Sequence, residues 1–379
     1  MRPETEDAVA AQIAAAKGPL RIEGGGTRPI GRPVDGDVLS LAGLSGITLY
    51  EPGALTLVAK AGTPLAEVEA ALDAERQMLA FEPSDMRRLL GTEGVPTIGG
   101  VVACNVSGPR RVSAVGACRD SLLGVRFVDG AGTVLKNGGR VMKNVTGYDL
   151  TKMMCGAYGT LGALTEVSLK VLPRPDAAVT VTIAGLDAGR AVAAMSAALT
   201  TPFEVTGAFY GPFGDGGTLH LRVEGMEGSV AYRAGALVKE LAAYGAATVE
   251  SDGTATLWAD IRDMAYLAES ACVTRTALRP SQAAAFIAAV DEGAEATHYL
   301  DWGGGLIWSG LDVGAGDAVS VMHGAAARLG GHTTVVKAPE DLRRSVPSFQ
   351  PQNPTVTALS EGLRAKFDPR GILNPGVMT

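Results

Sequence analysis

At residues 96–110 the chain reads PTIGGVVACNVSGPR, and this stretch decides the fold prediction. Glycine, hydroxyl and amide side chains are mixed there with small apolar residues. The same mixture recurs as GGGT at 24–27, GACRD at 116–120 and GAYGTLG at 156–162. Glycine lacks the Cβ that keeps a backbone away from a phosphate, and successive N–H groups form a concave anion cradle. Several such segments in one half of the chain predict an elongated dinucleotide site.

Two common nucleotide-binding signatures are missing from these 379 residues. The sequence has no GxxxxGK[ST] loop, which argues against phosphate binding by a P-loop. It also has no GxGxxG between a strand and a helix, so the Rossmann route to NAD or FAD is unsupported. The dinucleotide is therefore expected on another fold.

Composition narrows the class of protein. The chain is 46% hydrophobic and 19% charged, which is enough for a sizeable core and two domains. The net charge of −7 argues against a nucleic-acid clamp. The four cysteines form no CxxC pair, and they are expected to be reduced thiols rather than disulfides or metal ligands. No secretory signal, membrane-spanning run or metal site is expected.

Local patterns predict mixed helix and sheet on both sides of a boundary near Pro173 and Pro175. Before it, we expect a strand at 55–62, a helix from Thr63 to about Arg76 with Thr63 as N-cap, and a hairpin over 122–136. After it, we expect strands at 179–183 and 219–223 and helices at 188–199 and 232–244. This order predicts a mostly antiparallel α+β second domain, and no internal repeat is visible in the sequence.

These motifs resemble a known family. GGGT, PTIGG with Asn105 and SG, and VTGYDL at 145–150 are similar to the vanillyl-alcohol-oxidase type (PCMH-type) FAD-binding fold. The ending DPRGILNPG at 368–376 is similar to the terminal motif of its FAD-linked oxidases. Chain length, SGPRR at 107–111 and DWGG at 301–304 most resemble the smaller FAD-binding subunits of bacterial glycolate oxidases. The resemblance covers residues 20–173 and the C-terminal tail well, and the middle of the chain poorly.

The resemblance implies an α+β protein with a two-lobed PCMH-type FAD-binding domain at 1–173, an α+β cap domain at 174–345, and a C-terminal segment at 346–379 that returns to the FAD domain. It also implies three groups of FAD contacts. The pyrophosphate group is Gly24, Gly25, Gly26, Thr27, Thr97, Ile98, Gly99 and Gly100; the flavin group is Asn105, Ser107, Gly108, Gly116 and Asp120; the ribose and adenine group is Gly159, Thr160, Gly162 and Leu164. Any one of these positions could instead be an ordinary turn glycine or capping hydroxyl.

Two departures from the family pattern bear on the cofactor. Covalent members place a histidine beside the first glycine loop, whereas Thr27 and Arg28 stand there and no histidine precedes His220. Noncovalent FAD is therefore expected. The terminal motif often carries a basic residue after Asn-Pro-Gly, whereas this chain has Val377.

Oxidation of a 2-hydroxy acid needs a base, a cation for the carboxylate and a flavin to receive hydride. The four histidines, His220, His298, His323 and His332, are scattered, and each is expected to be a surface or hydrogen-bonded core residue. The catalytic residue is unknown, and His332 in its Gly-Gly-His element is the best candidate. Arg275 and Arg279 are unplaced candidates for the carboxylate. The Arg110-Arg111 pair could contact flavin phosphates or a partner, or lie on a solvated turn.

The resemblance implies partners as well. Electrons from a reduced flavin would pass to a larger flavoprotein subunit and an iron–sulfur subunit, in a cytoplasmic complex or one held at the inner membrane by those partners. The reaction would convert glycolate or D-lactate to the 2-oxo acid. Two alternatives stay open: a flavin-loaded electron-transfer or assembly subunit with no substrate oxidation of its own, and an unrelated reductase on the same FAD fold.

Overall fold

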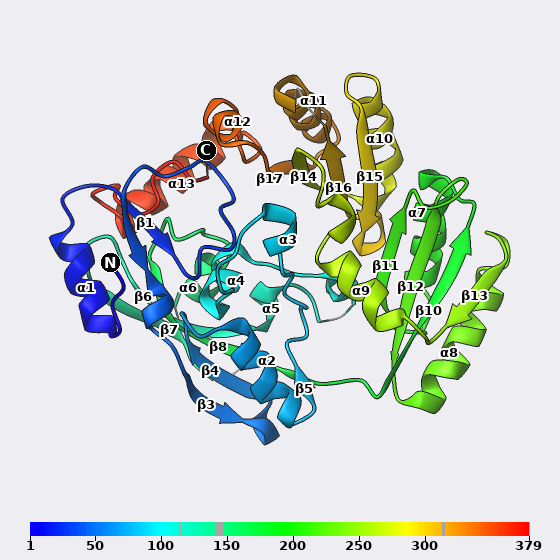
Figure 1. The fold of residues 1–379 in the computed structure, drawn as a ribbon, viewed down its shortest axis with the longest axis horizontal. Helices are drawn as coiled ribbons and strands as arrows, with labels where there is room; N and C mark the ends of the chain where they lie inside the picture. The colour runs from blue at the N-terminus through cyan, green and yellow to red at the C-terminus, as the bar shows by residue number, and fades with distance from the viewer. Residues whose placement is uncertain (114, 141–146, 313–314, 379) are drawn as a thin grey trace. The chain divides into compact units, whose positions relative to one another are not determined.

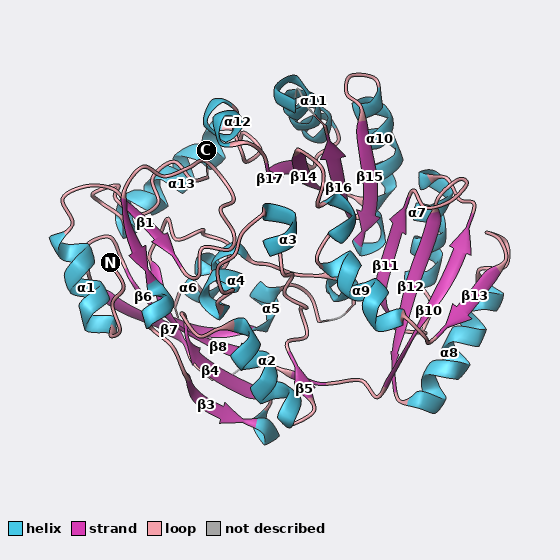
Figure 2. Cartoon of the chain, in the orientation of Figure 1, coloured by secondary structure: helices cyan, strands magenta, loops and turns pink. Residues whose placement is uncertain are grey.

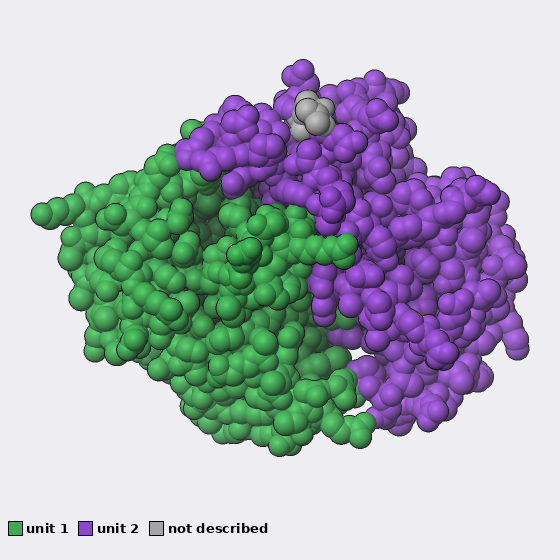
Figure 3. Space-filling view, in the orientation of Figure 1, with its two compact units in different colours: residues 1–107, 116–174, 352–379 green, residues 108–115, 175–351 purple. Residues whose placement is uncertain are grey.

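The computed structural model describes residues 1–113, 115–140, 147–312 and 315–378. Its contacts divide the chain into two compact units (Figure 3). Unit 1 comprises residues 1–107, 116–174 and 352–379, and unit 2 comprises residues 108–115 and 175–351. This division differs from the expected one in two places. Residues 108–115 group with unit 2, and the returning tail begins at residue 352 instead of 346.

Unit 1 is built on a five-stranded antiparallel sheet with the order β3-β4-β8-β6-β7 (Figures 1 and 2). Its strands are β3 (Ile47–Glu51), β4 (Thr56–Lys60), β6 (Leu122–Val128), β7 (Val134–Gly138) and β8 (Ala163–Lys170). Two smaller sheets pair β1 (Leu20–Glu23) in parallel with β2 (Asp37–Ser40), and β5 (Gln77–Met78) with β9 (Leu172–Pro173). The helices are α1 (Glu6–Ala15), α2 (Leu65–Ala74), α3 (Arg87–Leu90), α4 (Ile98–Cys104), α5 (Cys118–Ser121), α6 (Leu150–Met154) and α13 (Pro354–Phe367).

The strand β4, the helix α2 and the β6–β7 hairpin lie where the sequence predicts them. The predicted N-cap of α2 is wrong, because Pro64 occupies that position. The Thr63 hydroxyl instead accepts the Gly46 N–H at 3.0 Å and donates to the Lys60 carbonyl at 2.7 Å. A buried hydroxyl is satisfied by whichever partner the tertiary structure brings, and here that partner is a neighbouring loop.

The C-terminal motif closes unit 1 on its first strand. The Leu20 N–H donates to the Ile372 carbonyl at 2.7 Å, and the Asn374 N–H donates to the Leu20 carbonyl at 3.0 Å. The Asn374 side chain accepts the Ile22 N–H at 2.7 Å and donates to the Tyr158 carbonyl at 2.7 Å. One asparagine thereby ties the tail to two segments from the first half of the chain.

Unit 2 contains one eight-stranded sheet with the order β13-β10-β12-β11-β15-β16-β14-β17. Its strands are β10 (Ala177–Ala184), β11 (Val205–Gly211), β12 (Thr218–Gly225), β13 (Ala247–Glu250), β14 (Cys272–Ala277), β15 (Ala296–Asp301), β16 (Leu306–Leu311) and β17 (His332–Lys337). Its helices are α7 (Ala188–Leu199), α8 (Glu227–Glu240), α9 (Thr254–Arg262), α10 (Ala283–Asp291), α11 (Ala315–Arg328) and α12 (Glu340–Ser345). The predicted antiparallel α+β architecture is confirmed, and α7 has the predicted bounds, whereas α8 starts five residues earlier than the predicted Tyr232.

The sheet of unit 2 consists of two halves with the same topology. The first half runs β10-α7-β11-β12-α8-β13, and the second runs β14-α10-β15-β16-α11-β17. If the strands of each half are numbered along the chain, they lie in the sheet in the order 4-1-3-2. The halves join where β11 pairs with β15, at Tyr210 and Leu300. The repeat that the sequence did not reveal is therefore one of topology, a doubled β-α-β-β-α-β motif.

The two faces of this sheet differ in what covers them. Helices α7, α8, α10 and α11 pack against one face (Figure 2). The core on that face contains apolar side chains such as Val181, Leu221 and Leu300. Successive strand residues point to opposite faces. The other face therefore carries Phe209, His220, Tyr299, Trp308 and Arg275, which the strand register places opposite one another.

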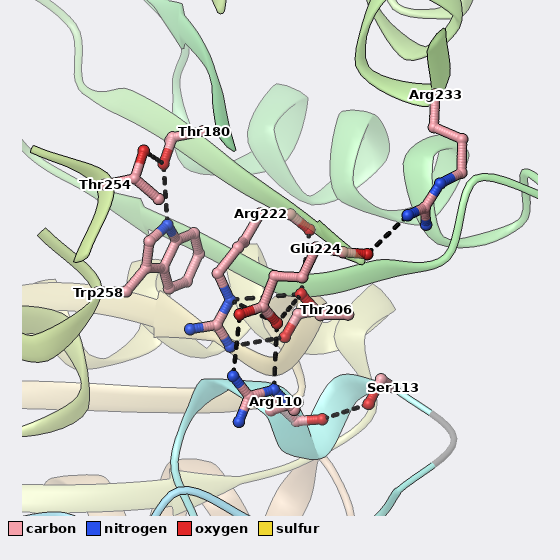
Figure 4. A network of polar contacts seen from close by, with 9 residues as sticks. All are labelled: Arg110, Ser113, Thr180, Thr206, Arg222, Glu224, Arg233, Thr254 and Trp258. Atoms are coloured by element: carbon pink, nitrogen blue, oxygen red, sulfur yellow. Dashed lines mark hydrogen bonds and ion pairs between the residues drawn. The ribbon is translucent and has the colours of Figure 1, made fainter. Parts of the chain in front are cut away.

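The short segment 108–115 is fastened to this second face by a buried ion pair (Figure 4). The guanidinium of Arg110, which is only 8% exposed, donates to both Glu224 carboxylate oxygens at 2.9 and 3.1 Å. Arg222 lies on the other side of the same carboxylate, at 3.4 Å. Arg110 therefore lies neither on a solvated turn nor toward a partner, because Glu224 holds it inside unit 2.

Loss of the Glu224 charge should destabilise unit 2. Burial raises the pKa of this carboxyl, but Arg222 and Arg110 outweigh burial and hold the pKa below its usual value. Glu224→Gln leaves two buried guanidiniums without their counter-charge, and we expect a loss of about 3–5 kcal/mol in the free energy of unfolding at pH 7, measured by chemical denaturation. Glu204→Gln is the control, because Glu204 is 82% exposed and its pair with Arg233 should contribute ~0–1 kcal/mol.

The same pair sets a pH dependence. Because the folded pKa of Glu224 is lowered, its stabilising contribution is complete above the unfolded pKa of about 4.3 and is lost as pH falls through the folded value. Wild-type protein should therefore lose this increment on acidification, whereas Glu224→Gln should not. Equal stability of the two proteins at pH 7 would show that the pair contributes nothing.

Candidate functional site

The first glycine loop, 24–27, packs directly against the segment that precedes α4. A Cβ on Gly24 would lie 2.2 Å from the Thr97 hydroxyl, and a Cβ on Gly25 would lie 1.6 Å from the Val95 carbonyl oxygen. Both contacts are far inside the distance that real Cβ atoms keep. These two glycines are therefore required by contact between two pieces of chain.

Two other predicted glycines have more room, Gly26 fully and Gly100 in part. Gly26 has φ +71°, and a Cβ there would meet nothing within 4 Å. A Cβ on Gly100 would meet the Thr97 hydroxyl at 3.3 Å and the Arg28 Nη1 at 3.9 Å. By contrast, a Cβ on the adjacent Gly99 would lie 2.7 Å from the Ala61 carbonyl oxygen. The room that a ligand could use therefore lies at Gly26 and Gly100.

The first glycine loop, 24–27, and the segment 97–100 also differ in how their backbone N–H groups are hydrogen-bonded. The Ile98 N–H donates to the Thr63 carbonyl at 3.0 Å, the Gly99 N–H to the Ala61 carbonyl at 2.8 Å, and the Gly100 N–H to the Thr97 hydroxyl at 3.3 Å. These donors are already used by the fold. Within the part of the chain that the structure describes, the N–H groups at 25–27 donate no such hydrogen bond. The donors available to an anion therefore come from the first loop.

Arg28 adds a positive charge beside these open positions. Its Nη2 donates to the Ser84 carbonyl at 2.8 Å, while its Nη1 lies on the open side of Gly100. Its charge also reaches Asp85, whose pKa is lowered mainly by the hydrogen bond from Arg87 and further by Arg28. In the sequence, Arg28 stands beside the first glycine loop, where a covalent flavin linkage would need histidine. Its position directly after GGGT is the signal in the sequence by which this residue could have been predicted.

The predicted flavin-side residues of unit 1 shape the turn that starts α5. The Asn105 carbonyl Oδ1 accepts the Arg119 N–H at 3.0 Å, and the Ser107 hydroxyl accepts the Cys118 N–H at 2.9 Å. Asp120 accepts the N–H of Ala117 at 2.8 Å. These side chains satisfy backbone donors at the beginning of a helix, as capping residues do.

Gly116, between these residues, has φ +69°, and a Cβ there would lie 2.5 Å from the Asp120 carboxylate. The turn therefore requires glycine. Gly108 belongs to unit 2, where its carbonyl accepts the Trp302 indole N–H at 3.0 Å. The predicted flavin-side set is thus divided between the two units.

The predicted ribose and adenine group lies around β8 and the C-terminal tail. Gly159 has φ +70° and approaches the Asn374 side chain, and the Thr160 hydroxyl donates to the Ala157 carbonyl at 2.7 Å. Gly162 lies against Phe127, and Leu164 is buried in β8. In the similar motif at 145–150, residues 145 and 146 lie outside the described residues.

Three of the four histidines are held within unit 2. His298 is buried and contacts Ser309 at 2.8 Å and Asp291 at 3.2 Å. His220 contacts Thr182 at 3.2 Å, and burial lowers its pKa to about 4. Burial also lowers the pKa of His323, on α11. His332, the best catalytic candidate from the sequence, is exposed at the first position of β17.

The sequence predicts neither disulfides, nor a metal site, nor a membrane-spanning segment. All four cysteines are free thiols. Across the described ranges, no group of three or more His, Cys, Asp or Glu side chains is placed to hold a metal ion. None of the described helices combines the length and apolar character that crossing a membrane would require.

Comparisons with known proteins agree on a flavin fold. Residues 1–138 match a family model described as a FAD binding domain. The chain is 36% identical over 370 residues to glycolate oxidase subunit GlcE from Escherichia coli (strain K12), covering 97% of this chain and 94% of that protein. It is 34% identical over 148 residues to a D-lactate dehydrogenase from Anaerostipes hadrus, covering 39% of this chain and 29% of that one. A solved 4-ethylphenol oxidase from Gulosibacter chungangensis shares the fold, with a TM-score of 0.71 at 15% identity over 100% of this chain and 88% of that chain.

The FAD binding domain and the similarity to curated oxidoreductases place the chain among the FAD-linked oxidoreductases. Its similarity over nearly the whole length then fixes the family. The chain belongs to the family of glycolate oxidase subunit GlcE. The open positions at Gly26 and Gly100, with the N–H donors at 25–27, fit the phosphate-bearing part of FAD.

Two neighbouring glycines should respond oppositely to substitution. Gly100→Val meets the side chains of Thr97 and Arg28 rather than backbone, so we expect the protein to fold cooperatively but to lose FAD. Gly99→Ala drives a Cβ into the Ala61 backbone, so we expect a lower melting temperature whether or not FAD is present. Thermal unfolding and the flavin-to-protein absorbance ratio measure both effects. Full flavin occupancy in Gly100→Val would show that this position is only a structural turn.

Proposed function

We propose that this chain is the FAD-binding subunit of a multi-subunit oxidase that converts a small 2-hydroxy acid, glycolate or D-lactate, to the 2-oxo acid. The observation that carries the proposal is the 36% identity with GlcE over 97% of this chain, since that relative is named as a subunit of glycolate oxidase. The partial similarity to a D-lactate dehydrogenase supports the same substrate class.

In this proposal unit 1 holds FAD without a covalent bond. The N–H groups at 25–27 and the Arg28 guanidinium receive the pyrophosphate, and Gly100 provides the space for it. Of the predicted flavin-side residues, those of unit 1, Asn105, Ser107, Gly116 and Asp120, surround the flavin. Gly159, Thr160, Gly162 and Leu164 lie along the ribose and adenine. When bound, FAD supplies the acceptor for hydride, which no amino-acid side chain can provide.

The electrons then need a route out of the chain. In this proposal the electrons pass from the flavin to redox centres in other subunits. We propose a larger flavoprotein subunit and an iron–sulfur subunit as partners, in the cytoplasm or held at the inner membrane by those partners. The chain itself presents no membrane-spanning helix among its described residues.

A second candidate function is a flavin-loaded electron-transfer or assembly subunit, with the hydroxy acid oxidised in a partner. The engagement of His220 and His298 with their neighbours favours it, because neither is poised as a base. A reductase on the same fold is a third reading. Anaerobic addition of glycolate and of NAD(P)H to the isolated flavoprotein distinguishes these readings, since each predicts a different reductant for the flavin.

Noncovalent attachment gives a direct prediction. No histidine precedes His220, so nothing near the first glycine loop can form a histidyl–flavin bond. Acid precipitation of the purified holoprotein should release all yellow colour into the supernatant. Flavin that remains with the precipitate would contradict the prediction.

The subunit role predicts little activity in isolation. We expect the FAD-loaded chain alone to reduce an artificial dye with glycolate or D-lactate no faster than a substrate-free control. Co-expression with the larger flavoprotein and iron–sulfur partners should restore dye reduction, because they supply the electron exit. Robust turnover by the isolated chain would rule out an obligate need for partners.

A further inference from the structure

The indole of Trp302 carries two guanidinium groups. The Arg111 Cζ lies 4.2 Å from the ring centroid, and the Arg275 Cζ lies 5.9 Å from it. Arg111 comes from segment 108–115, Arg275 from β14, and Trp302 from the turn between β15 and β16. All three belong to unit 2 and are only partly buried. Segments distant in the sequence therefore bring two positive charges to one aromatic ring.

This ring is held firmly in place. The Trp302 indole N–H donates to the Gly108 carbonyl at 3.0 Å, and its backbone N–H donates to the Asp301 carboxylate at 2.7 Å. Arg111 is fixed in turn because its neighbour Arg110 is locked to Glu224. Both arginines thus lie against a ring that is already ordered, which lowers the entropic cost of using them as a binding site.

The strand register brings a third group to the same area. On β17, Thr334 lies opposite Arg275, and His332 lies opposite Ala277, two residues farther along β14. His332 therefore shares the face of the sheet that carries Arg275. Although His332 is exposed as a residue, partial desolvation of its imidazole lowers the pKa, and the charges of Arg275 and Arg111 lower it further. Both charges that act on this imidazole are positive, so the area favours an anion.

We propose that Arg111 and Arg275 bind the carboxylate of a small 2-hydroxy acid on unit 2, with His332 beside its 2-hydroxyl. The identity of the ligand rests on the proposed function, whereas the anion site rests on the geometry. A planar guanidinium fork matches a carboxylate, and the Trp302 ring supplies an apolar wall for the short carbon chain. The neutral imidazole of His332 accepts a hydrogen bond from the 2-hydroxyl.

Calorimetric titration of the holoprotein with glycolate and with oxalate, at fixed ionic strength, tests the site. Removal of one charge-assisted contact in Arg275→Gln should weaken both ligands roughly 10- to 100-fold. Arg328→Gln is the matched control, because Arg328 is exposed at the end of α11, which packs on the other face of the sheet, and this variant should bind as wild type does. Arg275→Lys should recover part of the affinity, since it keeps the charge but loses the fork.

A spectroscopic readout separates binding from a structural role. Binding of a carboxylate beside His332 should raise the pKa of its imidazole, which NMR of histidine-labelled holoprotein can follow. An unchanged His332 titration at saturating oxalate would overturn the proposal. Equal binding by wild type and Arg275→Gln would also overturn it, as would sulfate binding as tightly as glycolate.

The flavin content of each variant keeps this inference distinct from the proposed function. Weaker ligand binding by Arg275→Gln at full FAD occupancy supports the anion site. Failure of the wild-type holoprotein to bind either acid, with FAD present, overturns the anion site and leaves the FAD-binding role standing. A wild-type chain that never takes up FAD would instead contradict the proposed function.

Discussion

The buried carboxylate of Glu224 holds two guanidinium groups from separate segments of unit 2 together. It lies between Arg110 and Arg222, and a charge in this position is tolerated only because both guanidiniums reach it. Its pairing with Arg110 holds segment 108–115 in unit 2, although the residues on either side of this segment belong to unit 1. Through that segment it also sets the position of Arg111 against Trp302. One electrostatic requirement thereby determines both where the chain leaves unit 1 and where positive charge gathers in unit 2.

Glycine-rich loops serve two separate purposes in unit 1. Gly24, Gly25 and Gly99 allow pieces of backbone to touch, whereas Gly26 and Gly100 leave space that the protein does not fill. The N–H groups follow the same division, since those of α4 bond within the fold and those at 25–27 do not. A motif that resembles one uniform phosphate cradle therefore consists partly of glycines that backbone packing requires. The difference depends on partners that lie far away in the sequence.

The two faces of the sheet in unit 2 carry different kinds of side chain. Four helices from the doubled β-α-β-β-α-β motif bury one face, and the apolar core lies there. The opposite face carries aromatic, histidine and arginine side chains at paired register positions. Because strand residues alternate between faces, the same strands can supply both layers without conflict. This arrangement explains how a sheet with so regular a core also offers polar groups to a ligand.

The sequence by itself determined the local elements, the FAD-binding class and the antiparallel α+β character of unit 2. Helix α7, strand β4 and the β6–β7 hairpin follow from apolar periodicity and turn residues, which act within a few neighbouring positions. Only the tertiary structure decided that Arg110 pairs with Glu224, that Arg28 lies beside Gly100, and that two arginines share Trp302. Such pairings join residues that are tens to hundreds of positions apart. They are selected by burial and by the need to satisfy buried charge, and neither can be seen in a local window of sequence.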